Sequence, residues 1–455
     1  MENFSQKNIL VVGAGLSGRA LARYFASAGA KVVLTDQRQE QGLADLQSLR
    51  DLGVTFDLGG HTESLFLQAD LIVVSPGVSL DVPVLRAARQ KGVPILGEVE
   101  IAWRDLDAPL IGVTGTNGKS TTTSLLGEIF QAWGKEAFVG GNLGTPMIEA
   151  VDRKDWDFLV VELSSFQLEA LDRFRPKYAL LLNLSEDHLD RYPDYNAYIA
   201  AKCEIFRNQT VDDWAILNAD DPQVVALEDQ LQAKIVHFSS QQPLTEGMWR
   251  DGGELVWRWQ GVEIRFPVAD LLLQGRHNVE NVMAAMIPAL LENCPAEIAW
   301  CAACRFNGLP HRMQTVRVVN GVTWINDSKG TNVGSVVKSL AGLPAPVTLI
   351  AGGKDKGGDY SPLVSALPGK VSHLVLLGEA AARLEQELCD VESTIHRVET
   401  LAEAVSLSAL LTPAGGTVLL SPACSSFDMF SSYEERGENF QTLVMDIPAR
   451  KEGTA

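Results

Sequence analysis

Short apolar runs that end in polar or glycine-rich residues recur along almost the whole chain. Such runs indicate strands buried in a parallel sheet, and the stretches with helical spacing between them indicate the helices that cover it. The predicted strands are residues 8–12, 31–35, 71–74, 110–113, 158–161, 178–182, 322–325, 347–351, 374–377 and 418–420. The alternation of strands and helices predicts an α/β fold.

The pattern changes between residues 234 and 267, where apolar and polar residues alternate in short stretches, among them 254–259 and 262–266. This alternation predicts a small antiparallel annex to the sheet. A chain of 455 residues is too long for a single core, and three domains are expected. They are a Rossmann-like domain over 1–97, a central P-loop ATPase-like domain with the annex over 98–308, and a Rossmann-like α/β domain over 309–455.

The net charge of −19 argues against general affinity for nucleic acid or for anionic membranes. No apolar run is long enough to cross a bilayer, and the polar start of the chain lacks the apolar core of a signal peptide. A cytoplasmic protein without membrane insertion is therefore expected. The six cysteines are scattered, and the close pair Cys301 and Cys304 continues a helical pattern, which favours helix packing over a redox motif.

The stretch 110–121 has the layout of a P-loop: an apolar strand, a glycine-rich turn, a Lys-Ser pair and a helix. Glycines let backbone N–H groups approach a polyphosphate, and the helix N-terminus adds positive potential. The lysine would neutralise the outer phosphates, and the serine hydroxyl would hold Mg²⁺. The strict pattern has glycine where this chain has Val113. The stretch predicts an ATP site formed by Gly115, Thr116, Asn117, Gly118, Lys119, Ser120 and Thr121.

The first domain carries Gly13, Gly15 and Gly18 between its first strand and first helix, and Asp36 ends the second strand. This is the Rossmann fingerprint, in which the glycines admit a pyrophosphate and the acid meets a ribose hydroxyl. Taken alone, it predicts an NAD-dependent oxidoreductase. Glycines that serve only tight turns and helix packing are the alternative. The loop 75–77 follows the third strand beside the same sheet edge.

Two predicted strands of the central domain lead into residues that could bind a cation. Glu162 follows one strand, and His188 lies in the polar stretch after the next. Because ligands sit beyond the carboxyl ends of parallel strands, the two could hold a divalent cation near the phosphates. The alternatives are a helix cap at Glu162 and a local turn contact at His188. Lys202, on the predicted helix 198–206, lies near the same sheet end, although a single helical lysine is usually a surface residue.

Three strands of the last domain end in polar or glycine-rich loops, 326–332, 352–356 and 421–428. The loops contain lysines and hydroxyl groups, which suit an anionic ligand. Because they follow strands of one predicted sheet, we expect them to form one composite site.

Together these motifs resemble the Mur ligase family over nearly the whole chain. The resemblance rests on the P-loop 115–121, the stretches 162–167 and 186–190, the pair His277-Asn278, and the stretches 310–312 and 326–329. The first glycine motif and the stretch 420–437 are most similar to the branch that adds D-glutamate to UDP-N-acetylmuramoyl-L-alanine. Val113 is then a variant that this family shares.

The resemblance implies an ATP-dependent amide ligase of peptidoglycan synthesis. The carboxylate of the UDP-linked substrate would take the γ-phosphate of ATP, and the amine of D-glutamate would attack the resulting acyl phosphate. Because several anions must meet, two Mg²⁺ ions and lysines are expected to offset their repulsion. The enzyme is expected to act as a monomer.

The same resemblance implies roles for individual residues. The catalytic residues would be Lys119, Asn142, His188 and Lys202. The metal ligands would be Ser120, Glu162, His188 and a carbamylated Lys202. The nucleotide would also contact Asn281, Arg312 and Asp327. The UDP substrate would contact Leu16, Ser17, Asp36, Arg38, Ser75, Gly77 and Asn142. The D-glutamate pocket would comprise Lys329, Thr331, Lys356, Ser426, Phe427 and Tyr433.

Three alternatives stay open at this point. The first is another Mur ligase, such as an alanine-adding one, or a ligase similar to folylpolyglutamate synthetase. The second is an NAD-dependent oxidoreductase with an accessory ATP site, which the fingerprint around Gly13 and Asp36 favours when taken alone. The third is a non-catalytic nucleotide sensor, which would bind ATP without turnover.

Overall fold

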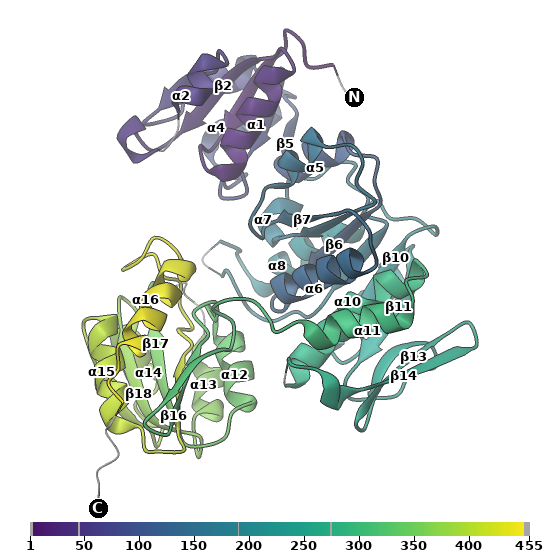
Figure 1. Ribbon diagram of the computed structural model, residues 1–455. Coiled ribbons are helices and arrows are strands. Elements are labelled where there is room, and N and C mark those ends of the chain that lie inside the picture. The colour runs from purple at the N-terminus through teal and green to yellow at the C-terminus, as the bar shows by residue number, and fades with distance from the viewer. Residues whose placement is uncertain are drawn as a thin grey trace, which may run out of the picture. The chain divides into compact units, whose positions relative to one another are not determined.

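A computed structural model describes residues 3–43, 46–189, 191–273, 275–355, 357 and 359–449 of the chain (Figure 1). These residues form three β-sheets flanked by helices, which confirms the predicted α/β class. Each sheet lies within one of the three predicted domains, whose limits stay a prediction. The contacts divide the chain into two compact units. The first comprises Met1–Leu184, Ile199–Leu271 and Glu280–Phe306, and the second comprises Ser185–Tyr198, Leu272–Val279 and Asn307–Ala455.

The first sheet has five parallel strands in the order β3-β2-β1-β4-β5. The strands are β1 Asn8–Val12, β2 Lys31–Asp36, β3 Thr55–Leu58, β4 Leu71–Val74 and β5 Ile95–Gly97. The helices are α1 Leu16–Ser27, α2 Gln47–Asp51, α3 Glu63–Gln68 and α4 Pro83–Gln90, with the 3₁₀ turn η1 Glu40–Gly42. The strand order reverses between β1 and β4, and ligands of such sheets bind at this switch point.

The glycine motif after β1 has a packing reason. Gly13 has a φ of 96°, and a Cβ on Gly18 would lie 1.7 Å from the Gly13 carbonyl oxygen. Only glycine therefore lets α1 approach the end of β1 this closely. This packing role of the glycines does not exclude the predicted nucleotide site, because a loop without side chains also leaves its backbone accessible to a ligand.

The central sheet has nine strands in the order β14-β13-β12-β11-β10-β9-β6-β8-β7. The strands are β6 Leu110–Thr114, β7 Ala137–Gly141, β8 Phe158–Glu162, β9 Tyr178–Leu181, β10 Trp214–Asn218, β11 Lys234–Ser239, β12 Gly247–Asp251, β13 Glu254–Trp259 and β14 Val262–Pro267. The helices are α5 Glu98–Arg104, α6 Lys119–Ala132, α7 Ser165–Leu168, α8 Tyr195–Cys203, α9 Pro222–Val225, α10 Arg276–Leu291 and α11 Ala296–Arg305. The 3₁₀ turns are η2 Met147–Asp152, η3 Glu204–Phe206, η4 Glu228–Gln230 and η5 Val268–Asp270.

The predicted antiparallel annex is smaller than its sequence range. β12, β13 and β14 pair antiparallel, whereas β11 pairs parallel with both β10 and β12. β12 begins beside the last residues of β11, where Phe238 lies opposite Met248. The chain therefore runs in the same direction in both strands, and no hairpin forms between them. The sequence analysis also missed β7 and β10, which supply further parallel strands.

The cysteine pair lies where the helical pattern placed it. Cys301 and Cys304 are both on α11, which packs against α6 (Figure 1). No disulfide joins any of the six cysteines among the residues that the structure describes. The interpretation as a packing helix is confirmed.

The third sheet has six strands in the order β15-β16-β20-β17-β18-β19. They are β15 Gln314–Val319, β16 Val322–Asn326, β17 Val347–Gly352, β18 Val371–Leu377, β19 Thr394–Arg397 and β20 Thr417–Leu420. The helices are α12 Val333–Ala341, α13 Ser361–Ala366, α14 Ala381–Glu387, α15 Leu401–Leu411 and α16 Tyr433–Met445. β15, which was not predicted, forms a hairpin with β16 through Asn320 and Gly321, both with positive φ.

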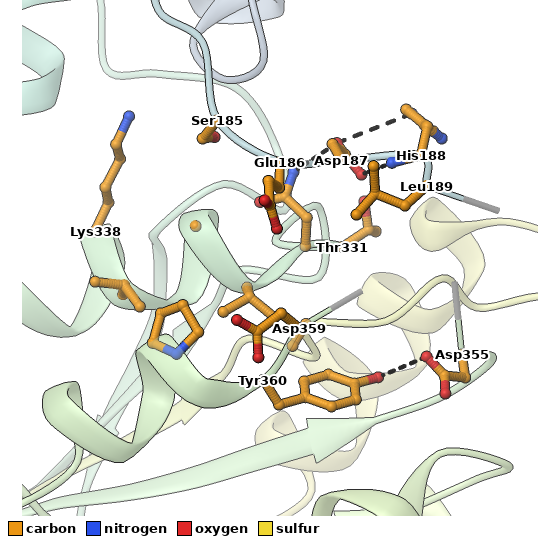
Figure 2. A pocket seen from close by; sticks show the side chains of 16 residues that line it. Ser185, Glu186, Asp187, His188, Leu189, Thr331, Lys338, Asp355, Asp359 and Tyr360 are labelled. Atoms are coloured by element: carbon orange, nitrogen blue, oxygen red, sulfur yellow. Dashed lines mark hydrogen bonds and ion pairs between the residues drawn. The ribbon is translucent and has the colours of Figure 1, made fainter. Parts of the chain in front are cut away.

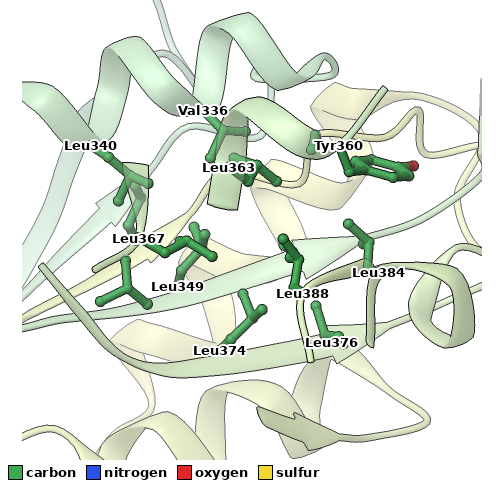
Figure 3. Close-up of a cluster of buried hydrophobic side chains, with 14 of the residues drawn as sticks. Val336, Leu340, Leu349, Tyr360, Leu363, Leu367, Leu374, Leu376, Leu384 and Leu388 are labelled. Atoms are coloured by element: carbon green, nitrogen blue, oxygen red, sulfur yellow. The ribbon is translucent and has the colours of Figure 1, made fainter. Parts of the chain in front are cut away.

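Both faces of this third sheet are covered. In β17, Leu349 belongs to the cluster beneath α12, α13 and α14, while its neighbour Ile350 belongs to the cluster beneath α15 and α16. Figure 3 shows the first cluster, in which Leu340 of α12, Leu363 of α13 and Leu384 of α14 surround the strand residues. Burial on both faces explains why the strand has a continuous apolar run instead of an alternating one.

No helix in the described part of the chain has the length and apolar character needed to cross a membrane.

A buried carboxyl group makes the stability of the first unit depend on pH. Glu98 of α5 is fully buried, and its Oε1 accepts the Ile148 N–H at 2.6 Å, while no described residue bonds Oε2. Burial raises the pKa of Glu98 to about 7. The folded state thus keeps a proton that the unfolded chain releases from about pH 4.5 upward, so stability falls between pH 4.5 and 7 and then levels off.

We expect Glu98→Gln to remove this part of the pH dependence, worth at most about 3 kcal/mol for a pKa moved from 4.5 to about 7. Urea unfolding at pH 5 and pH 8 measures it. The loss of stability on going to pH 8 should be smaller in Glu98→Gln than in wild type. Glu128→Gln, at an exposed site on α6, serves as the control and should keep the wild-type difference. Equal pH dependence in all three proteins would contradict the prediction.

Candidate active site

The P-loop has the backbone geometry that an anion site requires. β6 ends at Thr114, Gly115 and Gly118 take φ values of 142° and 91°, and α6 begins at Lys119. Lys119 Nζ donates to the carbonyl oxygens of Gly115 at 2.9 Å and Thr116 at 2.8 Å. The lysine is thereby folded over the loop at the N-terminus of a long helix, where phosphate binding is favoured.

The next two P-loop residues, Ser120 and Thr121, are buried in the first turn of α6. Asn281 of α10 lies against the same turn: a Cβ on Gly118 would lie 2.2 Å from its Oδ1, and Thr122 Oγ1 donates to this oxygen at 3.5 Å. The structure therefore brings the predicted nucleotide residue Asn281 to the P-loop, although α10 is remote in sequence.

Glu162 and Asn142 meet beside the P-loop strand. In the parallel register, Glu162 at the end of β8 lies opposite Val113 of β6 and Gly141 of β7. Asn142 Nδ2 donates to Glu162 Oε1 at 2.7 Å, and the Glu162 side chain is buried. The alternative of a helix cap at Glu162 is wrong, because Ser164 caps α7 with a capping box.

Lys202 is among the largest fully buried side chains, with 2% of its surface exposed. Its Nζ donates to the Gly115 carbonyl oxygen at 2.8 Å, the oxygen that Lys119 also contacts. The interpretation as a surface lysine is therefore wrong. The parallel sheet brings Lys119, Glu162 and Lys202 to one edge, where their charges act on the same small volume.

The loop that carries His188 belongs to the second unit and lines a pocket there of about 460 Å³ (Figure 2). His188 has a φ of 57°, and its carbonyl accepts the N–H groups of Arg191 and Tyr192, so the local turn contacts do form. Asp187 Oδ2 accepts a hydrogen bond from Asn332 Nδ2 at 2.9 Å. The pocket is lined by Ser185, Glu186, Asp187, His188, Leu189, Thr331, Asn332, Val333, Gly334, Val337, Lys338, Asp355, Asp359, Tyr360, Pro362 and Ala423.

The predicted D-glutamate residues are only partly gathered in this pocket. Of the five described ones, Thr331 lines it, and the other four lie elsewhere in the second unit. Lys329 Nζ donates to the Tyr433 hydroxyl at 3.0 Å and lies 4.7 Å from the centre of the ring. Ser426 is buried and Phe427 is 67% exposed. Lys356 lies outside the described residues.

The sequence analysis missed the side chain that connects these loops. Arg436 of α16 is buried and donates to the carbonyl oxygens of Ser328 at 2.8 Å and Ser425 at 3.2 Å. Burial lowers the pKa of Arg436 to about 10, and the charge of Asp428 acts in the opposite direction. A buried guanidinium that bonds to carbonyl groups fixes the loops after β16 and β20, which carry Lys329 and Ser426. The only indication of Arg436 in the sequence was its position within the stretch 420–437, which carries part of the family resemblance.

Asp327, predicted to contact the nucleotide, is enclosed by protein. Its Oδ2 accepts the hydroxyl groups of Ser339 at 2.8 Å and Ser421 at 2.7 Å, and its Oδ1 accepts the Met313 N–H at 3.2 Å. Burial raises the pKa of Asp327, and nearby Arg312 acts in the opposite direction. Arg312, the other predicted contact in this unit, therefore lies near this carboxyl group, whose oxygens are used within the fold.

Six of the seven predicted UDP residues lie in the first domain, around the loops that follow β1, β2 and β4, whereas the seventh, Asn142, follows β7 of the central sheet. Asp36 Oδ2 accepts the Ala14 N–H at 2.7 Å, and both carboxylate oxygens accept the Arg38 guanidinium, at 3.0 and 2.8 Å. Despite partial burial, these bonds lower the pKa of Asp36 to about 2. Ser75 Oγ donates to the Gly13 carbonyl at 3.0 Å. Leu16 is 67% exposed, Gly77 is exposed, and Ser17 is half-buried at the start of α1.

Three sequence profiles match in succession and together cover most of the chain. They are the MurD-like N-terminal domain of Mur ligases over residues 7–97, the Mur ligase middle domain over 113–289, and the Mur ligase glutamate ligase domain over 311–424. The chain belongs to the Mur ligase family. This membership agrees with the P-loop geometry and with the three sheets.

Two relatives match nearly the whole chain. A UDP-N-acetylmuramoylalanine–D-glutamate ligase of Syntrophotalea carbinolica is 57% identical over 447 residues, which are 98% of this chain and 99% of the relative. A ligase with the same name from Geotalea uraniireducens is 52% identical over 443 residues, 97% of this chain and 98% of the relative.

Solved structures of more distant Mur ligases share the fold. The UDP-N-acetylmuramate–alanine ligase MurC of Thermotoga maritima has a TM-score of 0.61 and 20% identity, covering 97% of this chain and 99% of its own. A pseudomurein peptide ligase type C of Methanothermus fervidus has a TM-score of 0.61 and 19% identity, covering 97% and 100%. At this identity the likeness concerns the fold alone.

We expect Lys119→Ala to lower the turnover number on the order of 10²–10³-fold, because the variant loses the cation that the P-loop prediction assigns to the phosphates. Steady-state ADP release measures this, with circular dichroism as the check on folding. Lys135→Ala is the matched control: this lysine follows the other end of α6, is half-buried and pairs with Asp157. A folded Lys119→Ala variant with more than about a third of wild-type turnover would show that the loop is not the ATP site.

Proposed function

We propose that the chain is an ATP-dependent, ADP-forming amide ligase that joins D-glutamate to UDP-N-acetylmuramoyl-L-alanine in peptidoglycan precursor synthesis. The observation that carries the proposal is the P-loop geometry, with Lys119 and Lys202 on one carbonyl oxygen, in a chain 57% identical to a ligase of that name. Because ATP and UDP-linked sugars are cytoplasmic metabolites, the cytoplasm is the proposed location, and a monomer the proposed active form.

The chemistry explains why an ATP site and an acid-binding site belong in one protein. A carboxylate is a poor acyl donor, because it would have to expel an oxide ion. Phosphorylation by ATP supplies a leaving group, and the acyl phosphate is then open to attack by the amine of D-glutamate. Lys119 would neutralise charge on the phosphate oxygens during transfer, at a helix N-terminus that already favours anions.

Mg²⁺ is a proposed cofactor at two positions, and the donor set of the first unit fits a hard cation. Ser120 offers a hydroxyl oxygen and Glu162 a buried carboxylate, both at the C-terminal edge of the parallel sheet. A carbamylated Lys202 would contribute to the second position. His188 lies in the second unit, and its role as a metal ligand stays a prediction. When bound, Mg²⁺ supplies charge neutralisation to the phosphate oxygens. Asn142 orients Glu162 through its 2.7 Å hydrogen bond.

The first sheet would bind the UDP part of the substrate. The geometry of Asp36 disfavours the NAD alternative, because its carboxylate accepts four hydrogen bonds. Oδ1 accepts from the Arg38 backbone N–H and Nε, and Oδ2 accepts from Arg38 Nη2 and the Ala14 N–H. An acid engaged in this way lacks the open acceptor positions that a ribose diol needs. Arg38, with a half-exposed side chain, is positioned by this pair to contact a nucleotide base or phosphate.

The amino-acid pocket is proposed to lie at the loops that Arg436 connects. Lys329 and Tyr433 form an adjacent cation and hydroxyl, which suit the carboxylates of D-glutamate. Thr331, Lys356, Ser426 and Phe427 are the other proposed contacts. By contrast, the pocket in Figure 2 is lined by Glu186, Asp187, Asp355 and Asp359 against one lysine, Lys338. This excess of negative charge would repel the two carboxylates of D-glutamate. We therefore propose that D-glutamate binds on the Lys329 side of Thr331.

Substrate dependence of ADP release tests the function. With UDP-N-acetylmuramoyl-L-alanine present, we expect ADP release only on addition of D-glutamate, and not with L-alanine or L-glutamate. Activity with UDP-N-acetylmuramate and L-alanine would favour the alanine-adding alternative. ATP binding without turnover under any of these conditions would favour a nucleotide sensor. Tight NAD binding without binding of the UDP substrate would overturn the proposal.

Substitutions of Lys202 test its proposed carbamylation. A buried ammonium beside two metal ions would repel them by a few kcal/mol even at an effective dielectric near 20. Carbamylation converts it into an oxygen ligand. We expect Lys202→Ala to be nearly inactive and partly rescued by millimolar short carboxylic acids. Lys202→Arg should be inactive and should resist rescue, since its charge is fixed. Full activity of Lys202→Ala would exclude this role.

A further inference from the structure

Asn183, a residue outside the P-loop, binds the backbone N–H and the carbonyl oxygen of Asn117, at the centre of the loop. Asn183 follows β9, the strand next to β6. The Asn117 N–H donates to Asn183 Oδ1 at 2.9 Å, and Asn183 Nδ2 donates to the Asn117 carbonyl oxygen at 2.9 Å. One amide side chain thus pairs with both polar groups of one loop residue.

These two bonds continue the β6–β9 ladder beyond the ends of the strands. The Leu182 N–H donates to the Thr114 carbonyl at 3.1 Å, and the Thr116 N–H donates to the Asn183 carbonyl at 2.9 Å. The side chain of Asn183 then forms the next rung, in place of a backbone. Gly115 makes this approach possible, because a Cβ there would lie only 3.1 to 3.3 Å from Leu182 and Asn183 atoms.

The segment that carries Asn183 is itself fixed from its other side. Asn218 Nδ2, at the end of β10, donates to the Leu182 carbonyl at 2.9 Å. The Leu184 N–H donates to Asp221 Oδ2 at 2.8 Å. Asn183 is therefore a rigid reference for the P-loop, because its own backbone is tied to the neighbouring strand.

We propose that Asn183 is a positioning residue for nucleotide phosphates, an inference that rests on the ATP site proposed above. Its bonds direct the N–H groups of Thr116 and Asn117 toward β9 and away from the phosphates. The first N–H groups of α6 and Lys119, which folds over the same loop, are then the donors that this geometry offers to an anion. Without the bond from Asn183 Nδ2, the peptide group between Asn117 and Gly118 would be free to rotate. Its carbonyl oxygen would then point toward the phosphates and repel them.

Two variants of Asn183 test the inference. Asn183→Ala removes both bonds. Asn183→Asp keeps the shape and the acceptor but cannot donate to the Asn117 carbonyl, and it adds a negative charge. We expect Asn183→Ala to weaken calorimetric binding of Mg·ADP and of the ATP analogue AMP-PNP on the order of tenfold, and Asn183→Asp to weaken it more. The KM for ATP should rise, while the KM values for D-glutamate and the UDP substrate stay unchanged.

Asn218→Ala is the matched control. It removes a buried asparagine of the neighbouring strand that bonds the same segment, but on the side away from the P-loop. It should lower the melting temperature as Asn183→Ala does and keep nucleotide affinity within about twofold of wild type. If Asn183→Ala fails to fold, the isosteric Asn183→Asp decides.

The outcomes separate this inference from the function on which it rests. Unchanged nucleotide affinity in the folded Asn183 variants, with a wild-type protein that binds both nucleotides, would overturn this inference alone. An equal loss of affinity in Asn218→Ala would also overturn it, because the effect would then be general. A wild-type protein that binds neither nucleotide would overturn the proposed function together with this inference.

Discussion

The parallel pairing of β6 with β8 and β9 is the constraint on which the candidate site depends. It aligns the carboxyl ends of three strands, so that the P-loop, Glu162 and Asn183 leave the sheet at one edge. Close approach is possible because Gly115 has no side chain to meet β9. Residues that are distant in sequence thereby act on one small volume, which a single helix or loop could not achieve.

This edge concentrates positive charge in a chain with a net charge of −19. Lys119 and Lys202 both donate to the Gly115 carbonyl oxygen, and Lys202 is buried. Two ammonium groups on one oxygen repel each other at short range. Their arrangement suits a site that receives a polyphosphate, or one in which the buried lysine changes its charge. The long helix α6 adds the positive end of its dipole to the same place.

Several polar residues in motif positions are engaged by the protein itself. Asp36 is bound by Arg38, and Asp327 is enclosed by Ser339, Ser421 and Met313. Such residues hold the loops in shape, so their substitution would change a site even where they do not touch a ligand. Arg436 has the same effect with opposite charge, because it joins the loops after β16 and β20.

The sequence by itself determined the fold class, the three α/β runs and the P-loop, because continuous apolar runs and glycine spacing are local properties of the chain. It also placed Cys301 and Cys304 on a helix, since helical periodicity extends across them. Only the tertiary structure decided the surroundings of Lys202, which looks like a surface lysine in the sequence but is buried, with its Nζ on the Gly115 carbonyl oxygen. The direction of β11, the hairpin of β15 and the bonds of Asn183 to Asn117 likewise follow from pairing between distant segments, which local pattern does not specify.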